Sequence, residues 1–85
     1  MQQHIYYIKF ALQFADMQIA ELVNVFNSQV NLRGFTSMRA YHDAALMDEF
    51  QRRGIDTTCV HDGHSISFAQ PIAYDISQNK LVLLS

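Results

Sequence analysis

The chain has 85 residues, enough for one domain but close to the size at which a single hydrophobic core leaves only a small stability margin. Hydrophobic residues make up 49% of the sequence and charged residues 16%, against roughly 25% charged residues in an average soluble domain. The net charge is −2 and there is no run of lysine or arginine, which argues against a nucleic-acid partner because phosphates need a basic face. We therefore expect one domain over residues 1–85, with part of its surface covered by another chain.

Two features of the sequence bear on its compartment. Cys59 is the only cysteine, so no internal disulfide can form, and a reducing cytoplasm is the predicted location. The apolar segment 5–15 has no lysine or arginine before it and is interrupted by Lys9, which is not typical of a signal peptide. The segment is also shorter than the about 20 residues that cross a bilayer, so we expect no membrane partner.

The first predicted element is a strand over residues 6–14. Every second residue of this segment is apolar, and its first half is rich in residues that favour strands: Tyr6, Ile8, Phe10, Leu12 and Phe14. The residues between them are smaller or more polar, so a period of two fits the segment better than a helical period. A helix is the competing interpretation, in which one face carries Ile5, Ile8, Leu12 and Ala15.

Two helices are predicted next. Asp16 is a candidate N-cap, and the residues after it, as far as about residue 29, repeat apolar positions at helical spacing: Ile19, Leu22, Val23, Phe26 and Val30. Thr36 or Ser37 can cap a second helix, which contains no glycine, proline or β-branched residue to oppose it. Gly54 followed by Ile55 is typical of the end of a helix.

The rest of the chain is predicted to form three short strands. Asp62 and Gly63 separate the β-branched segments 55–61 and 64–74, and Asp-Gly is typical of a two-residue type I′ turn. Pro71 cannot donate to a ladder, so it marks a bulge, an edge or a break. A loop over 75–80 precedes the last strand, 81–85. The order β-α-α-β-β-β predicts an α+β fold with a mostly antiparallel four-stranded sheet and two helices packed on one face.

The predicted Asp-Gly turn also determines how the nearby cysteine and histidines should lie relative to one another. His61 faces His64 across the hairpin, and Cys59 lies one pair further along on the same face. Such a cluster is compatible with zinc, but its spacing matches none of the common zinc signatures, and a fourth ligand would have to come from elsewhere. We therefore predict no cofactor and keep zinc binding by Cys59, His61 and His64 as the alternative.

The same residues argue against an enzyme. Cys59 and His61 lie two positions apart on a predicted strand, about 6 to 7 Å at Cα, and an inward-facing thiol stays protonated. The sequence has no Gly-rich loop that could stabilise an oxyanion near them. No catalytic residue is predicted.

Two predicted strands are apolar on both faces, which points to a protein partner. Tyr7 points away from the apolar face of the first strand, and Val82 and Leu84 point away from the two leucines that alternate with them. Two helices can cover only one face of a four-stranded sheet, so the other face is left for another chain. We expect Tyr7, Val82 and Leu84 to bind a partner, with His61 and His64 as a second surface.

The functional hypothesis is a small non-enzymatic protein–protein interaction module, an adaptor, regulator or inhibitor that acts as a homodimer. After zinc binding, a third hypothesis is RNA or nucleotide recognition, with Tyr41 stacked on a base beside Arg39, Arg52 and Arg53. The sequence has neither a Gly-rich phosphate loop nor a basic surround for such a ligand. Packing of Tyr41 in the core is therefore the preferred interpretation.

Overall fold

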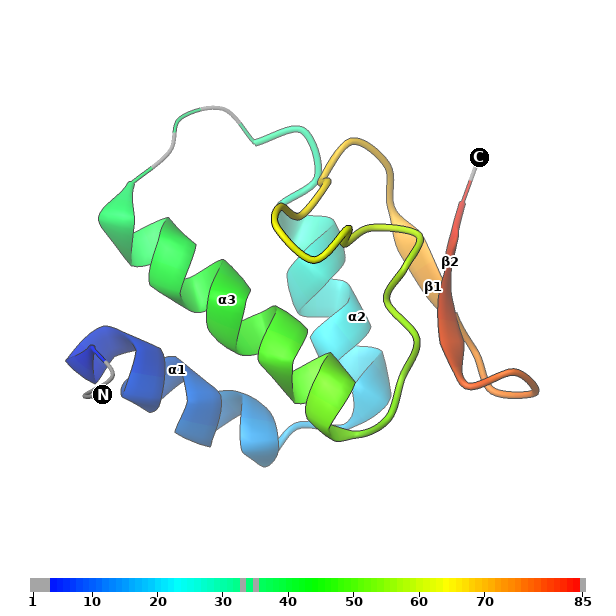
Figure 1. Cartoon of the computed structure of the whole chain (residues 1–85), viewed down its shortest axis with the longest axis horizontal. Helices are drawn as coiled ribbons and strands as arrows, with labels where there is room; N and C mark the ends of the chain where they lie inside the picture. Colours follow the sequence, from blue (N-terminus) through cyan, green and yellow to red (C-terminus); the bar gives the residue numbers. More distant parts are fainter. Residues whose placement is uncertain (1–3, 33, 35, 85) are drawn as a thin grey trace.

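The computed structural model describes residues 4–32, 34 and 36–84, and within them it shows three helices and a two-stranded sheet (Figure 1). In chain order the elements are α1 (Ile5–Ala15), α2 (Ile19–Ser28), α3 (Ser37–Arg52), β1 (Ile72–Asp75) and β2 (Lys80–Leu83). The predicted four-stranded sheet with two helices on one face is therefore wrong, although helices and an antiparallel pair of strands are both present. None of the described helices combines the length and the hydropathy of a bilayer-spanning segment.

The largest correction concerns residues 5–15, which form helix α1 and not a strand. The inner face of α1 packs on α3 and contributes Phe14, which is 1% exposed, to the core; Tyr7, Phe10 and Ala11 pack around it. These four positions follow the helical spacing i, i+3, i+4, i+7. The outer face of α1 is apolar as well, so a period of two and a helical period fit the same residues. Packing against α3 overrides the local preference for a strand.

The start of α2 also differs from the prediction. Asp16 is the C-cap of α1, and the N-cap of α2 is Gln18. The carboxylate of Glu21 accepts a hydrogen bond from the backbone N–H of Gln18 at 3.2 Å, as in a capping box. The buried face of α2 carries Leu22 and Phe26, so the helical spacing in the sequence identified the right face.

Helix α3 confirms the second predicted helix at both ends. Oγ1 of Thr36 accepts from the N–H of Arg39 at 3.1 Å, which is the expected N-cap. At the other end Gly54 has a φ of 75°, and the N–H of Ile55 donates to the carbonyl oxygen of Phe50 at 3.1 Å. Helix α3 lies between α1 and the segment that follows α3. Figure 1 shows this segment folding back along α3.

Residues 55–68 form a loop with two isolated bridges where two strands were predicted. His61 pairs with Ile66 and not with His64, so the connection has four residues. The carboxylate of Asp62 accepts from the N–H groups of His64 and Ser65, both at 2.8 Å, which closes the turn from the side chain. A type I′ turn needs positive φ at both central residues, but here Gly63 has it and Asp62 does not.

The predicted strands 64–74 and 81–85 form only in part, as the antiparallel hairpin of β1 and β2. Residues 64–71 lie outside β1, and Asp75 and Lys80, which were expected in the loop between the strands, pair with each other at the end of the hairpin. Ile72 pairs with Leu83 and Asp75 with Lys80, and residues 76–79 make the turn. Pro71 directly precedes β1, where its missing N–H interrupts no ladder. The core lies where this hairpin, the three helices and the loop 55–68 meet, and its buried hydrophobic members are Phe14, Leu22, Phe26, Ala45, Leu46, Met47, Phe50, Ile55, Val60, Ile72 and Leu81.

Asn27 ties α2 to the outer edge of β1. Its side-chain amide donates to the carbonyl oxygen of Ile72 at 3.0 Å and accepts from the N–H of Ile72 at 2.8 Å, as a neighbouring strand would. Asn27→Ala leaves both groups without a partner, so we expect the free energy of unfolding to fall by about 2 kcal/mol in urea denaturation. Asn24→Ala, at an exposed position of the same helix, should change it by less than about 0.5 kcal/mol. Equal losses would contradict this role of Asn27.

Candidate functional site

Four apolar residues lie in a row on the face of α1 that points away from the core, and we call them the outer stripe: Ile5, Ile8, Leu12 and Ala15. Leu12 is 67% exposed, Ile5 59% and Ile8 38%. Their spacing of three, four and three residues is that of the a and d positions of a heptad. The outward face of a surface helix is normally polar, so an exposed apolar row is a candidate protein-binding surface.

Contacts at both ends of α1 fix its orientation on the protein. At the start, the ring of His4, the N-cap residue, stacks on Tyr41 of α3 with ring centroids 4.1 Å apart. At the end, the guanidinium of Arg53 donates to the carbonyl oxygens of Phe14 at 3.1 Å and Met17 at 2.6 Å. These contacts and the packed inner face leave the outer stripe as the free side of the helix.

Tyr7, one of the predicted partner-binding residues, is half-buried between α1 and α3. Its hydroxyl donates a hydrogen bond to the carboxylate of Asp48. This hydrogen bond, together with burial and the negative charge of Asp48, raises the pKa of Tyr7 to about 12. The uncovered sheet face on which Tyr7 was expected does not exist, and the side chain helps to attach α1 to α3.

The other predicted partner-binding residues lie far from α1. Val82 is a half-buried residue of β2, and Leu84, just beyond it, is 46% exposed. Figure 1 shows β2 and α1 on opposite sides of the molecule, so these residues and Tyr7 do not form one surface. A role of Val82 and Leu84 in binding stays a separate prediction.

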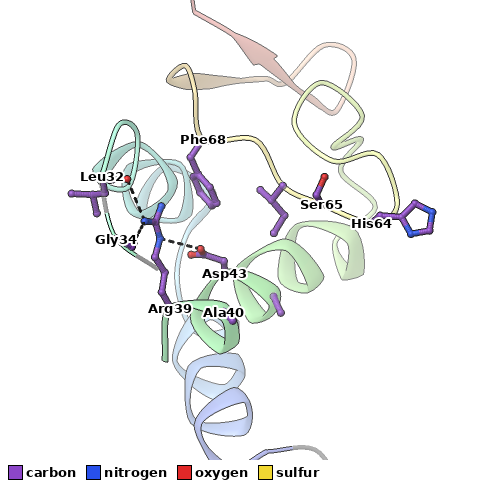
Figure 2. Close-up of a pocket in the computed structure, with 10 residues that line it drawn as sticks. Leu32, Gly34, Arg39, Ala40, Asp43, His64, Ser65 and Phe68 are labelled. Atoms are coloured by element: carbon purple, nitrogen blue, oxygen red, sulfur yellow. Dashed lines mark hydrogen bonds and ion pairs between the residues drawn. The ribbon is translucent and has the colours of Figure 1, made fainter. Parts of the chain in front are cut away.

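The structure does not bring the three candidate zinc ligands together. Sγ of Cys59 donates to the carbonyl oxygen of Leu81 at 3.1 Å, and Nδ1 of His61 lies 3.1 Å from Nε2 of Gln51. His64 is exposed, and its ring points away from the protein in Figure 2. Across residues 4–32, 34 and 36–84, no three histidine, cysteine, aspartate or glutamate side chains are arranged to hold a metal ion.

Cys59 should react slowly with thiol reagents. Burial raises the pKa of its thiol, and the nearby charge of Asp56 adds to the effect. Because the thiolate is the reactive form, we expect Ellman's reagent at neutral pH to modify the folded protein at least about ten-fold more slowly than the protein unfolded in guanidinium chloride. Equal rates in the two states would show that the folded protein exposes the thiol as fully, and ionises it as readily, as the unfolded chain does, and would contradict this prediction.

A cavity of about 640 Å³ lies between α3 and the loop 64–68 (Figure 2). Ala40 and Ala44 line it from α3, and Ile66 and Phe68 line it from the loop. Its volume is within the range of small-molecule sites. No sequence motif pointed to this cavity, because its two walls come from segments that are distant in the sequence.

The charged side chains beside the cavity, Arg39 and Asp43, form hydrogen bonds and ion pairs with other residues of the chain. The guanidinium of Arg39 donates to Oε1 of Gln29 at 3.1 Å and to the carbonyl oxygen of Gly34 at 3.0 Å, and it lies 3.4 Å from the carboxylate of Asp43. Asp43 also contacts Nδ1 of His42 at 3.1 Å. These side chains therefore hold the segment that connects α2 to α3 in place. Positions 33 and 35 lie outside the described residues.

The residues of the RNA hypothesis also take part in contacts within the chain. Arg52 and Arg53 both bind the buried carboxylate of Glu49, at 2.5 and 2.6 Å, and Tyr41 stacks on His4. Together with the contacts of Arg39, this geometry commits all three arginines of the hypothesis to groups within the chain. The outer stripe, by contrast, was visible in the sequence as the face of the competing helix.

Comparison with known proteins gives no relative: no protein-family model, no curated protein and no solved structure matches this chain. No ligand or partner can therefore be carried over from another protein. Function has to be inferred from the surfaces of the molecule itself.

Proposed function

We propose that this chain is a small non-enzymatic protein–protein interaction module, an adaptor, regulator or inhibitor, and that its binding surface is the outer stripe of α1. The observation that carries the proposal is the exposure of Ile5, Ile8 and Leu12 in one row on a helix whose opposite face is already packed. Covering this row with another protein removes apolar surface from water, which is the main driving force of association.

The surroundings of the outer stripe support this function. Lys9, Gln13 and Asp16 are exposed and lie along one edge of it, so the apolar row has a polar border on this side, as the centre of many protein interfaces has. Recognition of a helix through positions i, i+3 and i+7 is a recurrent mode of protein binding. The helix is held by its inner face and both ends, so it loses little conformational freedom when a partner binds.

Three further expectations from the sequence concern the compartment, a second binding surface and zinc. The cytoplasm stays the expected compartment, since the single cysteine needs no oxidising environment. His61 and His64, in the loop 55–68, stay a candidate second surface. Zinc binding is not proposed, because Cys59 and His61 make separate contacts and the ring of His64 points away from the protein in Figure 2.

The proposal is tested by comparing two asparagine variants in cells that make the chain. Leu12→Asn changes the outer stripe, whereas Ile76→Asn changes a residue that is 82% exposed in the β1–β2 turn, on the far side of the molecule from α1 in Figure 1. Proteins that co-purify with the unaltered chain, including further copies of it, should still bind Ile76→Asn and be lost from Leu12→Asn. Far-UV circular dichroism should be the same for all three, and equal recovery from both variants would refute the proposal.

A further inference from the structure

We infer that the partner of the outer stripe is a second copy of this chain, bound by an antiparallel, two-fold symmetric pairing of the two α1 helices. The inference rests on the proposed function and specifies its partner. Two independent properties of α1 support it, the positions of its apolar residues and the positions of its charges, because each is complementary to itself when the helix is reversed.

The apolar positions of the outer stripe are symmetric about Phe10. In an antiparallel pair centred at this level, Ile5 of one copy lies opposite Ala15 of the other, and Ile8 lies opposite Leu12. A large side chain therefore meets a small one at each end, and two large ones interlock near the centre on each side. In a parallel pair, Ala15 would lie opposite Ala15, and the contact would be shallow at that end.

Lys9 and Asp16 are the charged residues of segment 5–16, and both are exposed. Neither belongs to an ion pair among the residues that the structure describes. At 3.6 residues per turn they lie along the same edge of the outer stripe, and antiparallel pairing brings this edge of one helix beside the same edge of the other. Lys9 of the second copy is then about 7.5 Å along the axis from Asp16 of the first. Helical side chains lean toward their own N-terminus, so these two lean toward each other.

The order of charges along this edge distinguishes the two orientations. In the antiparallel pair it runs Asp16, Lys9 of the second copy, Lys9, and Asp16 of the second copy. The two lysines start about 3 Å apart along the axis, but their side chains lean away from each other and toward the two aspartates. In a parallel pair the same edge faces the opposite edge of the partner helix, which carries His4 and Ala11 and no aspartate. The charges therefore favour the antiparallel orientation.

The size of the surface sets the strength of the dimer. Helix α1 has 11 residues, so a pairing of two such helices falls at the low end of protein interface sizes. We expect a dimer that forms and dissociates with concentration and exchanges subunits readily. This property makes an exchange experiment practicable.

The test uses the full chain with Lys9→Asp and, separately, with Asp16→Lys. In each variant alone all charges along the paired edge have the same sign, whereas in a mixture of the two variants the signs alternate. Native mass spectrometry and sedimentation should show a one-to-one heterodimer that is at least about ten-fold tighter than either variant alone, with the difference reduced by salt. A chain with both substitutions restores the oppositely charged neighbours and should dimerise like the unaltered protein.

The outcomes separate this inference from the proposed function. If the mixture associates no more tightly than the separate variants, the antiparallel pair is overturned, although the outer stripe can still bind a partner. If the unaltered chain stays a monomer at every concentration, self-association is overturned. In both cases the proposed function stands when a different protein is recovered with the unaltered chain and lost from Leu12→Asn, and it fails when no recovery depends on Leu12. Circular dichroism of each variant confirms that these exposed substitutions leave the fold intact.

Discussion

Phe14→Ala should lower the free energy of unfolding by about 3–5 kcal/mol, whereas Leu12→Ala should lower that of the monomer by less than about 0.5 kcal/mol. Phe14 is 1% exposed and packs against Phe10 and against the ring of His42, whose centroid is 5.1 Å away. Leu12, two positions earlier, is 67% exposed. The contrast arises because a helix turns residues 12 and 14 to opposite sides, while a strand would place both on the same face.

Urea unfolding at low protein concentration, where the monomer dominates, measures both losses. A loss of this size is comparable to the whole stability of many small domains, so Phe14→Leu provides a milder second variant with an expected loss of about 1–2 kcal/mol. Similar losses at residues 12 and 14 would show that α1 does not have the orientation described, and the outer stripe would then be part of the core.

Arg53→Ala should lower the free energy of unfolding by about 2–4 kcal/mol, and Arg52→Ala should lower it by clearly less. Both arginines bind the buried carboxylate of Glu49, but Arg53 alone also donates to the carbonyl oxygens of Phe14 and Met17 at the end of α1. The side chain of Arg52 is 63% exposed, so water screens its ion pair with Glu49 and can hydrogen-bond the carboxylate when Arg52 is removed. Thermal or urea unfolding of the two variants makes the comparison, and equal losses would contradict the bridging role of Arg53.

The pH dependence of this effect has a definite sign. Burial raises the pKa of Glu49, but the hydrogen bonds from Arg52 and Arg53 outweigh it and hold the pKa below its ordinary value. A carboxylate with a lowered pKa contributes stability above its unfolded pKa of about 4.3 and loses that contribution as the pH falls through its folded pKa. The loss caused by Arg53→Ala should therefore shrink below about pH 4, down to the part due to the carbonyl contacts. A loss that grows with acidity would contradict this account.

The parts of the fold that were predicted correctly have local signals. Thr36 and Gly54 delimit α3 because a cap and a left-handed residue act within one turn of the helix. The turn near Asp62 was also recognised, but its length was wrong, since Asp-Gly indicates a turn without excluding one closed by the aspartate side chain. Capping and turn residues therefore indicate where a helix or strand ends more reliably than they indicate which segments pair with each other.

The parts that were predicted incorrectly depend on distant contacts. Segment 5–15 is apolar in both periodicities, and the choice between them is made by α3, which packs on Phe14 and binds Tyr7. The sequence predicts a further strand at the outer edge of β1. In the structure this edge is instead hydrogen-bonded by the side chain of Asn27, 45 residues before Ile72. Neither contact has a signature in the local sequence. The sequence therefore places the binding surface on a sheet face with Tyr7, Val82 and Leu84. It gives the residues of the outer stripe only as one face of the competing helix, without a binding role.

The proposal that the outer stripe is the binding surface is tested most directly by site-specific photo-crosslinking in cells that make the chain. A photoreactive amino acid replaces Leu12 in one sample and Ile76, its exposed counterpart in the β1–β2 turn, in the other. The account predicts a crosslinked product from position 12 with a defined mass, that of two copies of the chain if the partner is a second copy, and none from position 76. A product from position 76 alone, or equal products from both positions, would contradict it.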